Sequence, residues 1–396
     1  MKTELFNLIA KAALPLYKLI GGIEKKVFSK QIKILLIKPD HLGDVVLTTA
    51  AIEMVKNIWP NSIIWFMGKE WVLPILEHNP HIDRLIPFSP NWGAHNFEKA
   101  LSLPQITKLA RKIRKEKFDL SISFQEAPMN HLFATLCGIP ERAGYSPRGG
   151  KPLLTFSPED PGEDEHALKA HRRLVKETAV YLNIDTQESS LSDQNQTPKI
   201  YISDEEKNAA KLLLKTQCNI EDKFVAFHIG AGNPGKEISV EKAAQIAMAI
   251  VKDTKHKLLL TAGPSEVERL NNITLAIEKN MNKNADFCKN SQITNISTLS
   301  SLTVRELAAV LSKCSVYVGH DSGPSHIAAA MNVPVITMWG PGNPDKWAPK
   351  TGGTKSHIVR HQVCDDPPKR PICLDCKCLN EITGDEIAKL CVELIE

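Results

Sequence analysis

KILLIKPDHLGDVVLTTAAIEMVKN, residues 33–57, joins a short apolar run to a helical pattern. The run from Lys33 to Ile37 is almost wholly apolar, and a run of that length predicts a buried strand. Gly43 permits a tight turn, and the residues from Asp44 to Asn57 follow a helical pattern. A buried strand that leads directly into a helix is typical of a parallel sheet covered by helices on both faces. The stretch therefore predicts an α/β fold.

The same alternation continues along the chain. Short apolar runs predict further strands at residues 62–67, 84–88, 119–124, 224–228, 257–261, 315–318 and 334–338. Helical patterns occupy the intervals, at residues 104–117, in a stretch ending at Cys137, and at residues 239–253, 303–313 and 324–331. The helix at 104–117 is strongly basic, which we interpret as a solvated face.

A polar stretch, NIDTQESSLSDQNQTPK at residues 183–199, interrupts the alternation and predicts a linker. Two doubly wound parallel-sheet domains result, and such domains bind ligands in a cleft at the carboxyl ends of their strands. The expected organisation is a leader at residues 1–30, a first domain at 31–182, a linker at 183–200, a second domain at 201–382 and a final helix at 383–396 packing on the first domain.

Charge is balanced except near the start of the chain. The 396 residues carry 49 Lys plus Arg and 45 Asp plus Glu, a net charge of +4. Residues 1–30 hold the whole surplus, with six lysines against two glutamates. So small a net charge does not indicate nucleic acid as a partner. An apolar run of the roughly 18–20 residues that a spanning helix needs is also missing from the sequence.

The leader, residues 1–30, has an amphipathic helical pattern with three interpretations. A secretory signal is disfavoured because Lys11 and Lys18 interrupt its apolar part. A basic amphipathic helix on an anionic membrane surface fits the composition. A helix that packs on the same protein, or a partly disordered leader, fits as well. On the membrane interpretation we expect a cytoplasmic protein, peripheral on the inner face of the inner membrane.

Nine cysteines, an odd number without a secretory signal, indicate a reducing compartment and free thiols. Four of them cluster near the end of the chain, at Cys364, Cys373, Cys376 and Cys378. Their spacing departs from the two separated pairs typical of zinc sites. Ordinary thiols are therefore favoured over a structural metal.

Three loops that follow predicted strands contain residues suited to chemistry. In the first, residues 38–44, Asp44 lies near a helix N-terminus. It is either a helix cap worth roughly 1 kcal/mol or an acid at the cleft that acts as a general base. Spacing alone does not choose between these roles.

The second loop, GAGNPGK at residues 230–236, combines Gly230, Gly232 and Lys236. A dinucleotide fingerprint needs an acid after the next strand, and a P-loop needs Ser or Thr where this chain has Glu237. We reject both motifs. Flexible backbone N–H groups, a lysine and a following helix N-terminus still predict a diphosphate site, although a glycine-rich connection without a ligand remains the alternative.

The third loop, GHDSGPSH at residues 319–326, leads into another helix. Ser322 and Gly323 place backbone N–H donors at the N-terminus of the helix. Asp321 is suited to accept a hydrogen bond from a sugar hydroxyl. His326 lies one turn into the helix and is expected to point at the diphosphate predicted for the second loop. With His320 it lacks the third ligand that a metal site needs.

Four segments together resemble glycosyltransferase family 9, the heptosyltransferases of lipopolysaccharide core synthesis. They are IKPDHLGDVVLTTAAI, HIGAGNPGKEIS, GHDSGPSHIAAAMNVPVITMWGPGNP and the CLNEI of the Cys-rich tail, and the resemblance spans residues 31–395. It implies a GT-B fold of two Rossmann-like domains, the first for the acceptor and the second for the nucleotide-sugar. It also implies an inverting, metal-independent and cofactor-free transfer from ADP-heptose to the lipid A–inner core acceptor.

The resemblance assigns roles residue by residue. Asp44 matches the catalytic aspartate, and Glu266 matches a position that reaches the nucleoside in some members. The residues matched to the donor diphosphate and sugar are Gly230, Gly232, Lys236, Asp321, Ser322, Gly323 and His326. The middle segment departs from the family pattern Lys-x-Trp-Pro, since Lys236 is followed here by Glu237, Ile238 and Ser239.

Other functions remain open from the sequence. A non-catalytic nucleotide-sugar-binding module would keep Lys236 and Asp321 without needing Asp44. A family-9 transferase with a different nucleotide-diphosphate sugar would keep all three residues. An epimerase on the same fold would need a second acid/base set facing the donor sugar, and the sequence offers none.

Overall fold

The computed structural model describes residues 31–90, 102–184, 197–283, 295–361 and 377–396. The chain divides into two units, Met1–Gln196 and Thr197–Glu396, called unit 1 and unit 2 below. Their boundary falls within the expected linker at 183–200. The leader at residues 1–30 and three of the four clustered cysteines lie outside the described residues. Among the helices that are described, none has the length and apolar character needed to cross a membrane.

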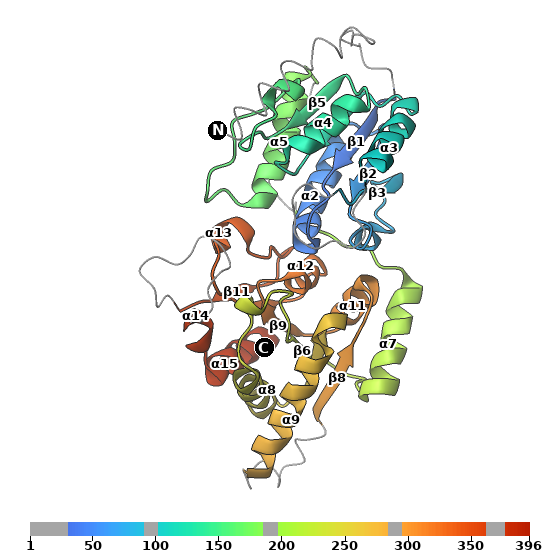
Figure 1. Ribbon diagram of the computed structural model, residues 1–396. Coiled ribbons are helices and arrows are strands. Elements are labelled where there is room, and N and C mark those ends of the chain that lie inside the picture. Colours follow the sequence, from blue (N-terminus) through green and yellow to red (C-terminus); the bar gives the residue numbers. More distant parts are fainter. Residues whose placement is uncertain (1–30, 91–101, 185–196, 284–294, 362–376) are drawn as a thin grey trace. The chain divides into compact units, whose positions relative to one another are not determined.

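Unit 1 contains a five-stranded sheet in the order β3-β2-β1-β4-β5, with every pair parallel. Its strands are β1 (Lys33–Ile37), β2 (Ile63–Gly68), β3 (Arg84–Pro87), β4 (Leu120–Ser123) and β5 (Glu141–Gly144). Its helices are α2 (Leu42–Ile58), α3 (Leu103–Lys115), α4 (Pro128–Leu136) and α5 (Ala167–Tyr181). The sheet and its helices are drawn at the top of Figure 1.

Alternation along β1 gives the sheet of unit 1 two apolar faces. Leu35 and Ile37 belong to a cluster that includes Ile106 and Ile113 of α3. Ile34 and Leu36 are equally buried and point to the opposite face. On that face α2 and α5 pack against each other. The wholly apolar run that predicted this strand therefore reflects burial on both sides.

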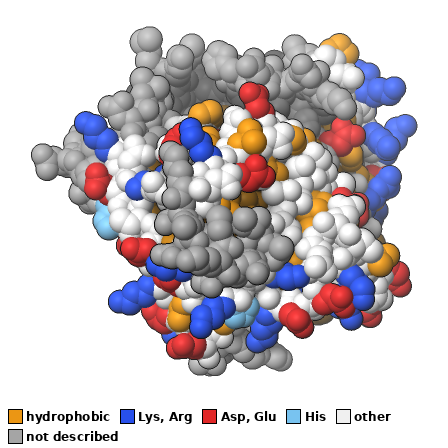
Figure 2. All heavy atoms as spheres, turned by 90° about the horizontal axis from the view of Figure 1, so that it is seen from below, with side chains coloured by type: hydrophobic (Ala, Val, Ile, Leu, Met, Phe, Trp, Pro, Cys, Tyr) orange, Lys and Arg blue, Asp and Glu red, His pale blue; other side chains and the backbone are white. Residues whose placement is uncertain are grey.

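Unit 2 contains a six-stranded parallel sheet in the order β11-β10-β9-β6-β7-β8. The strands are β6 (Phe224–His228), β7 (Lys257–Ala262), β8 (Ile296–Ser300), β9 (Val316–His320), β10 (Val335–Met338) and β11 (Ser356–Val359). The helices are α7 (Asp204–Cys218), α8 (Val240–Thr254), α9 (Val267–Lys283), α11 (Val304–Leu311), α12 (Gly323–Ala330), α13 (Pro344–Trp347), α14 (Lys377–Asn380) and α15 (Gly384–Ile395). Basic and acidic side chains lie interspersed over the lower part of the face drawn in Figure 2.

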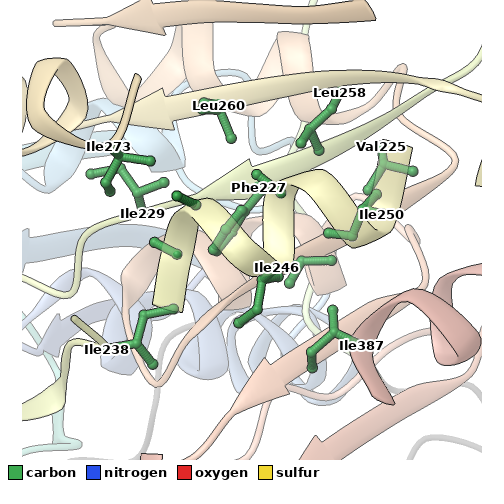
Figure 3. Packing of buried hydrophobic residues seen from close by; sticks show 14 of the residues in the cluster. Val225, Phe227, Ile229, Ile238, Ile246, Ile250, Leu258, Leu260, Ile273 and Ile387 are labelled. Atoms are coloured by element: carbon green, nitrogen blue, oxygen red, sulfur yellow. The ribbon is translucent and has the colours of Figure 1, made fainter. Parts of the chain in front are cut away.

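The core of unit 2 lies between its sheet and helices α8, α9 and α15. Phe227 of β6, Leu260 of β7, Ile246 of α8 and Ile387 of α15 belong to one apolar cluster, in which Ile387 lies on the side of α8 away from the strands (Figure 3). We expected the final helix to pack on the first domain, but its apolar face packs on α8 within unit 2. The physical reason is that α8 is apolar on more than the face it turns to the sheet, so α15 covers the remainder.

Both sheets reverse their strand order beside the first strand of the unit. In unit 1 the chain moves outward from β1 to β2 and β3 and then returns to β4 on the other side of β1. In unit 2 it moves from β6 to β7 and β8 and returns to β9. Ligands of doubly wound sheets bind beyond the carboxyl ends of the strands at such a reversal. The loops after β1 and β4, and those after β6 and β9, are therefore where a site is expected.

Candidate functional site

The loops after β6 and β9 bring together Lys236 and Asp321, which are 85 residues apart in the sequence. Lys236 ends a short 3-10 turn, Pro234–Lys236, in which the Asn233 side chain accepts a hydrogen bond from Gly235 N at 3.0 Å. The Nζ atom of Lys236 lies 2.5 Å from Oδ2 of Asp321. The side chains are 23% and 13% exposed, so the pair is partly shielded yet still reachable from solvent.

Asp321 directly precedes the N-terminus of α12. Ser322 is the N-cap residue of this helix and Gly323 is its first residue, one residue earlier than the pattern predicted. The Oγ of Ser322 donates to the carbonyl of His320 at 3.4 Å instead of capping the helix. The N–H groups of the first turn and the positive end of the helix dipole therefore lie beside the Lys236–Asp321 pair. His326 is buried on the same helix.

Glu266 occupies the loop after β7, next to the loop after β6. Its Oε1 accepts from Gly232 N at 3.1 Å and its Oε2 from Gly263 N at 2.8 Å. The Nε2 of His228 lies 3.5 Å from Oε2. Burial raises the pKa of Glu266, but the hydrogen bond and charge of His228 and the two backbone N–H groups outweigh it and lower that pKa to about 2. The carboxylate is therefore ionised at neutral pH.

Gly230 makes the position of Glu266 possible. A Cβ atom at residue 230 would lie 1.9 Å from Cδ of Glu266, so any larger residue there would displace the carboxylate. Gly232, with a φ of 66°, turns its N–H toward the same carboxylate. The two glycines that the sequence assigned to the diphosphate thus also hold Glu266 in place.

Two residues that the sequence reasoning did not select hold the loop from Ile229 to Ile238. Oε1 of Glu237 accepts from Ala231 N at 3.0 Å. The Nε of Arg269, on α9, lies 3.4 Å from Oε2 of Glu237 and donates to the carbonyl of Ile229 at 3.1 Å, and its guanidinium also donates to the carbonyl of Ile238. Glu237 stands where a P-loop has Ser or Thr, which was the available signal. No sequence signal pointed to Arg269, because only the tertiary structure brings α9 to this loop.

His320, the last residue of β9, contacts the end of the loop from Ile229 to Ile238. Its Nε2 accepts a hydrogen bond from Ile238 N at 3.3 Å. Burial, with the charges of Arg269 and His228, lowers the pKa of His320 to about 3, so the ring is neutral. Within the part of the chain that the structure describes, no three His, Cys, Asp or Glu side chains are placed to hold a metal ion.

Asp44 lies in unit 1, in the first turn of α2. The helix begins at Leu42 with His41 as its N-cap residue, two residues earlier than the pattern predicted. Asp44 is therefore the third residue of the helix and not its N-cap, and it is only partly buried. This position, at the carboxyl end of β1 and at the reversal of strand order, suits a reactive carboxylate.

Charged residues that the sequence reasoning did not single out lie near Asp44 at the carboxyl ends of β1 and β2. Lys38 lies 3.2 Å from Asp40 and donates to the carbonyl of Phe124, also at 3.2 Å. Burial raises the pKa of Asp40, but the charge of Lys38 and the N–H of His41 prevail and lower it to about 2. Burial and the charge of Lys38 lower the pKa of Lys69, at the end of β2, while Asp40 and Asp44 act in the opposite direction. Two carboxylates and two amines thus interact at one edge of the sheet.

A buried polar chain fixes the backbone at Asp44. The Oγ1 of Thr48 donates to the carbonyl of Asp44 at 2.8 Å and lies 3.2 Å from Nδ1 of His171 on α5. Burial, with the charge of Lys38, lowers the pKa of His171 well below its usual range. The neutral ring packs edge-on against Phe124, with 5.3 Å between ring centroids. The first turn of α2 is thereby tied to α5 and to the loop after β4.

Comparison with known proteins gives three results. The family model of glycosyltransferase family 9 (heptosyltransferase) matches residues 106–369. Lipopolysaccharide heptosyltransferase 2 of Escherichia coli K12 is 24% identical over 342 residues, covering 83% of this chain and 88% of its own. The crystal structure of a family 9 glycosyl transferase from Veillonella parvula is 22% identical with a TM-score of 0.76, covering 94% of this chain and 99% of its own.

A further structure, of the E. coli heptosyltransferase WaaC with ADP-2-deoxy-2-fluoro heptose, is 17% identical with a TM-score of 0.65. The similarity covers 91% of this chain and 99% of that chain. At such identities the two structures bear on the fold. They confirm the predicted class, two parallel-sheet α/β domains of the GT-B type.

Proposed function

The chain belongs to glycosyltransferase family 9 (heptosyltransferase), and from that premise we propose that it transfers heptose from ADP-heptose to the lipid A–inner core of lipopolysaccharide. It is a glycosyltransferase. The heptose is supported by the name of the E. coli relative, and the ADP by the nucleotide-sugar in the WaaC structure. The transfer is further proposed to invert the anomeric carbon and to need neither metal nor cofactor.

The Lys236–Asp321 pair beside the N-terminus of α12 is the observation that carries the proposal. A nucleotide diphosphate gains negative charge as it leaves the sugar. One lysine and the N–H groups of a helix N-terminus stabilise such charge without a divalent cation. Gly230 and Gly232 lack side chains and so let the diphosphate approach the loop backbone closely, and Asp321 and His326 hold the sugar and phosphate.

Asp44 is proposed as the general base. As the acceptor hydroxyl attacks the anomeric carbon, its proton passes to the Asp44 carboxylate and the new C–O bond forms. The bond from that carbon to the diphosphate oxygen breaks on the opposite face, and its electron pair leaves with ADP. A single displacement of this kind needs one carboxylate and inverts the configuration. Asp44 lies in the first turn of α2, where the positive end of the helix dipole is favourable to a negative charge.

Glu266 is proposed to bind the ribose. Each oxygen of an ionised carboxylate accepts about two hydrogen bonds, and Oε1 uses one of them for Gly232 N. The remaining lone pairs suit two neighbouring ribose hydroxyls. The low pKa of Glu266 ensures that it acts only as an acceptor at neutral pH.

Purified full-length chain, ADP-heptose and a deacylated inner-core acceptor provide the test. The wild type should form product with inverted anomeric configuration, read by NMR, at a rate that EDTA leaves unchanged. Asp44→Asn should lower kcat by roughly 100-fold or more while ADP binding, measured by calorimetry, stays the same. Full activity of that variant would refute the role of Asp44. Transfer from UDP- or GDP-sugars alone would refute the donor, and binding without any transfer would favour a non-catalytic module.

A further inference from the structure

Helix α3 of unit 1 presents a basic stripe to solvent. Its apolar residues Ile106, Ala110 and Ile113 are buried against the sheet. Lys108, Arg111, Lys112 and Lys115 are exposed and recur with the spacing i, i+3, i+4 and i+7, which places them on one face of a helix. This face lies opposite the buried one, because the two sets differ by about half a turn. These four residues are called the basic stripe below.

Acidic neighbours do not neutralise the basic stripe. Between residues 103 and 115 the sequence has no Asp or Glu. Glu116 is the first acid after the helix begins, and it pairs with Lys33 at 3.5 Å. Among the described residues, none of the four side chains forms an ion pair. On α7, in contrast, Lys207 pairs with Asp204 and Lys215 with Glu221.

The ordinary explanation for such a helix is incomplete. Basic residues near a helix C-terminus interact favourably with the helix dipole, which accounts for Lys112 and Lys115 in the last turn. It does not account for Lys108 or for the extension of the stripe over two turns. Like charges three or four residues apart on one face of a helix repel each other and destabilise the helix. A partner that carries a dense negative charge would remove that cost.

We propose that the basic stripe of α3 docks on an anionic lipid surface. The proposal rests on the proposed function, in which the acceptor is a membrane lipid. Because the described apolar side chains of α3 face the protein core, the contact is electrostatic and does not insert into the bilayer. A single-stranded nucleic acid fits less well. The segment from Ser102 to Lys117 has no aromatic residue on which bases could stack.

Vesicle co-sedimentation with the full chain, without donor or acceptor, tests the proposal. The vesicles are phosphatidylcholine with one quarter phosphatidylglycerol, or phosphatidylcholine alone. A variant carrying Lys108→Gln, Arg111→Gln, Lys112→Gln and Lys115→Gln should bind the anionic vesicles about tenfold less or weaker still. Its remaining binding should depend less steeply on salt. Neutral vesicles should bind neither protein.

A charge-matched control separates the stripe from net charge. Lys211→Gln, Lys215→Gln, Lys223→Gln and Lys252→Gln remove the same charge from exposed positions in unit 2 and should leave vesicle binding within about twofold of wild type. Both variants keep residues 1–30 intact. Unchanged binding of the stripe variant, or equal losses in the two variants, would overturn the proposal, as would a loss on duplex DNA without a loss on vesicles.

The same proteins distinguish this inference from the proposed function. The stripe variant should melt like the wild type and should transfer heptose to a deacylated, water-soluble acceptor at the wild-type rate. Absence of transfer by the wild type would refute the proposed function and leave the vesicle result intact. Loss of soluble transfer by the stripe variant alone would place α3 in the acceptor site and overturn the membrane role.

Discussion

The Nζ atom of Lys236 lies 2.5 Å from Oδ2 of Asp321, joining the loop after β6 to the loop after β9. The carboxylate holds the lysine at the reversal of strand order before any donor arrives. A lysine side chain fixed in this way loses little further rotamer freedom when it binds phosphate. The pair is thus both a preformed cation site and a link between two loops.

Lys236→Met should weaken ADP binding by roughly tenfold or more, because the charge proposed to bind the diphosphate is lost while the aliphatic stem remains. Calorimetric titration with ADP measures the effect. Lys252→Met, which removes an exposed lysine from α8, is the matched control and should bind ADP normally. Equal affinity of the two variants would contradict the assignment of Lys236.

Gly230→Ala should displace the carboxylate of Glu266, since the new methyl group would overlap it. Gly232 N and Gly263 N then lose their acceptor, at a cost of about 2 kcal/mol in the free energy of unfolding. Chemical denaturation measures this cost.

Glu266→Ala supplies the control for that substitution. The double variant Gly230→Ala/Glu266→Ala should be no less stable than Glu266→Ala alone, because the overlap is gone. Additive losses would show that Gly230 is required for a reason other than Glu266.

The low pKa of Glu266 predicts a pH dependence of stability. This pKa is about 2 in the folded chain and near 4.5 in the unfolded chain, so the unfolded state binds the proton more tightly. The contribution of Glu266 is therefore fully present above pH 4.5 and is lost as the pH falls toward 2. The difference in unfolding free energy between wild type and Glu266→Gln should shrink over that range. Glu268→Gln, at an exposed position on α9, should show no such trend.

Thr48→Val should lower kcat by about tenfold with little change in ADP affinity. The valine keeps the shape but removes the hydroxyl that fixes the backbone of Asp44, so the carboxylate loses its precise placement. Steady-state kinetics together with calorimetry separate the two effects. Thr48→Ser, which restores the hydroxyl, should recover most of the rate; failure to do so would indicate a packing effect.

The sequence was sufficient for the fold class because the inner strands are buried on both faces and therefore stand out as apolar runs. It did not predict β5, β8 or β11, because their sequences, ERAG, ISTLS and SHIV, are not apolar runs. It also placed Asp44, Lys236 and Asp321 in the segments that follow strands, and in the structure they follow β1, β6 and β9. Strand order could not be read in this way, because no local pattern records which strands are neighbours. Arg269 and His171 were not predicted as part of the site for the same reason. Each reaches a loop from a helix that only the tertiary structure brings near it.

Two errors came from treating helices one at a time. The pattern began α2 at Asp44, whereas Leu42 and Gly43 already belong to the helix. The apolar face of the final helix was matched to the first domain, because the sequence does not show that α8 has apolar surface left uncovered by its own sheet. Both depend on interactions between elements.

The packing of α15 on α8 has a consequence for biosynthesis. Helix α8 is complete at Thr254, but Ile387 and Cys391, which complete its cover, are translated more than 130 residues later. At roughly 5–20 residues per second, the growing polypeptide leaves the ribosome with apolar surface uncovered for about 7–30 s. During that interval unit 2 is a natural client for chaperones that bind nascent chains, while unit 1 has already been synthesised in full.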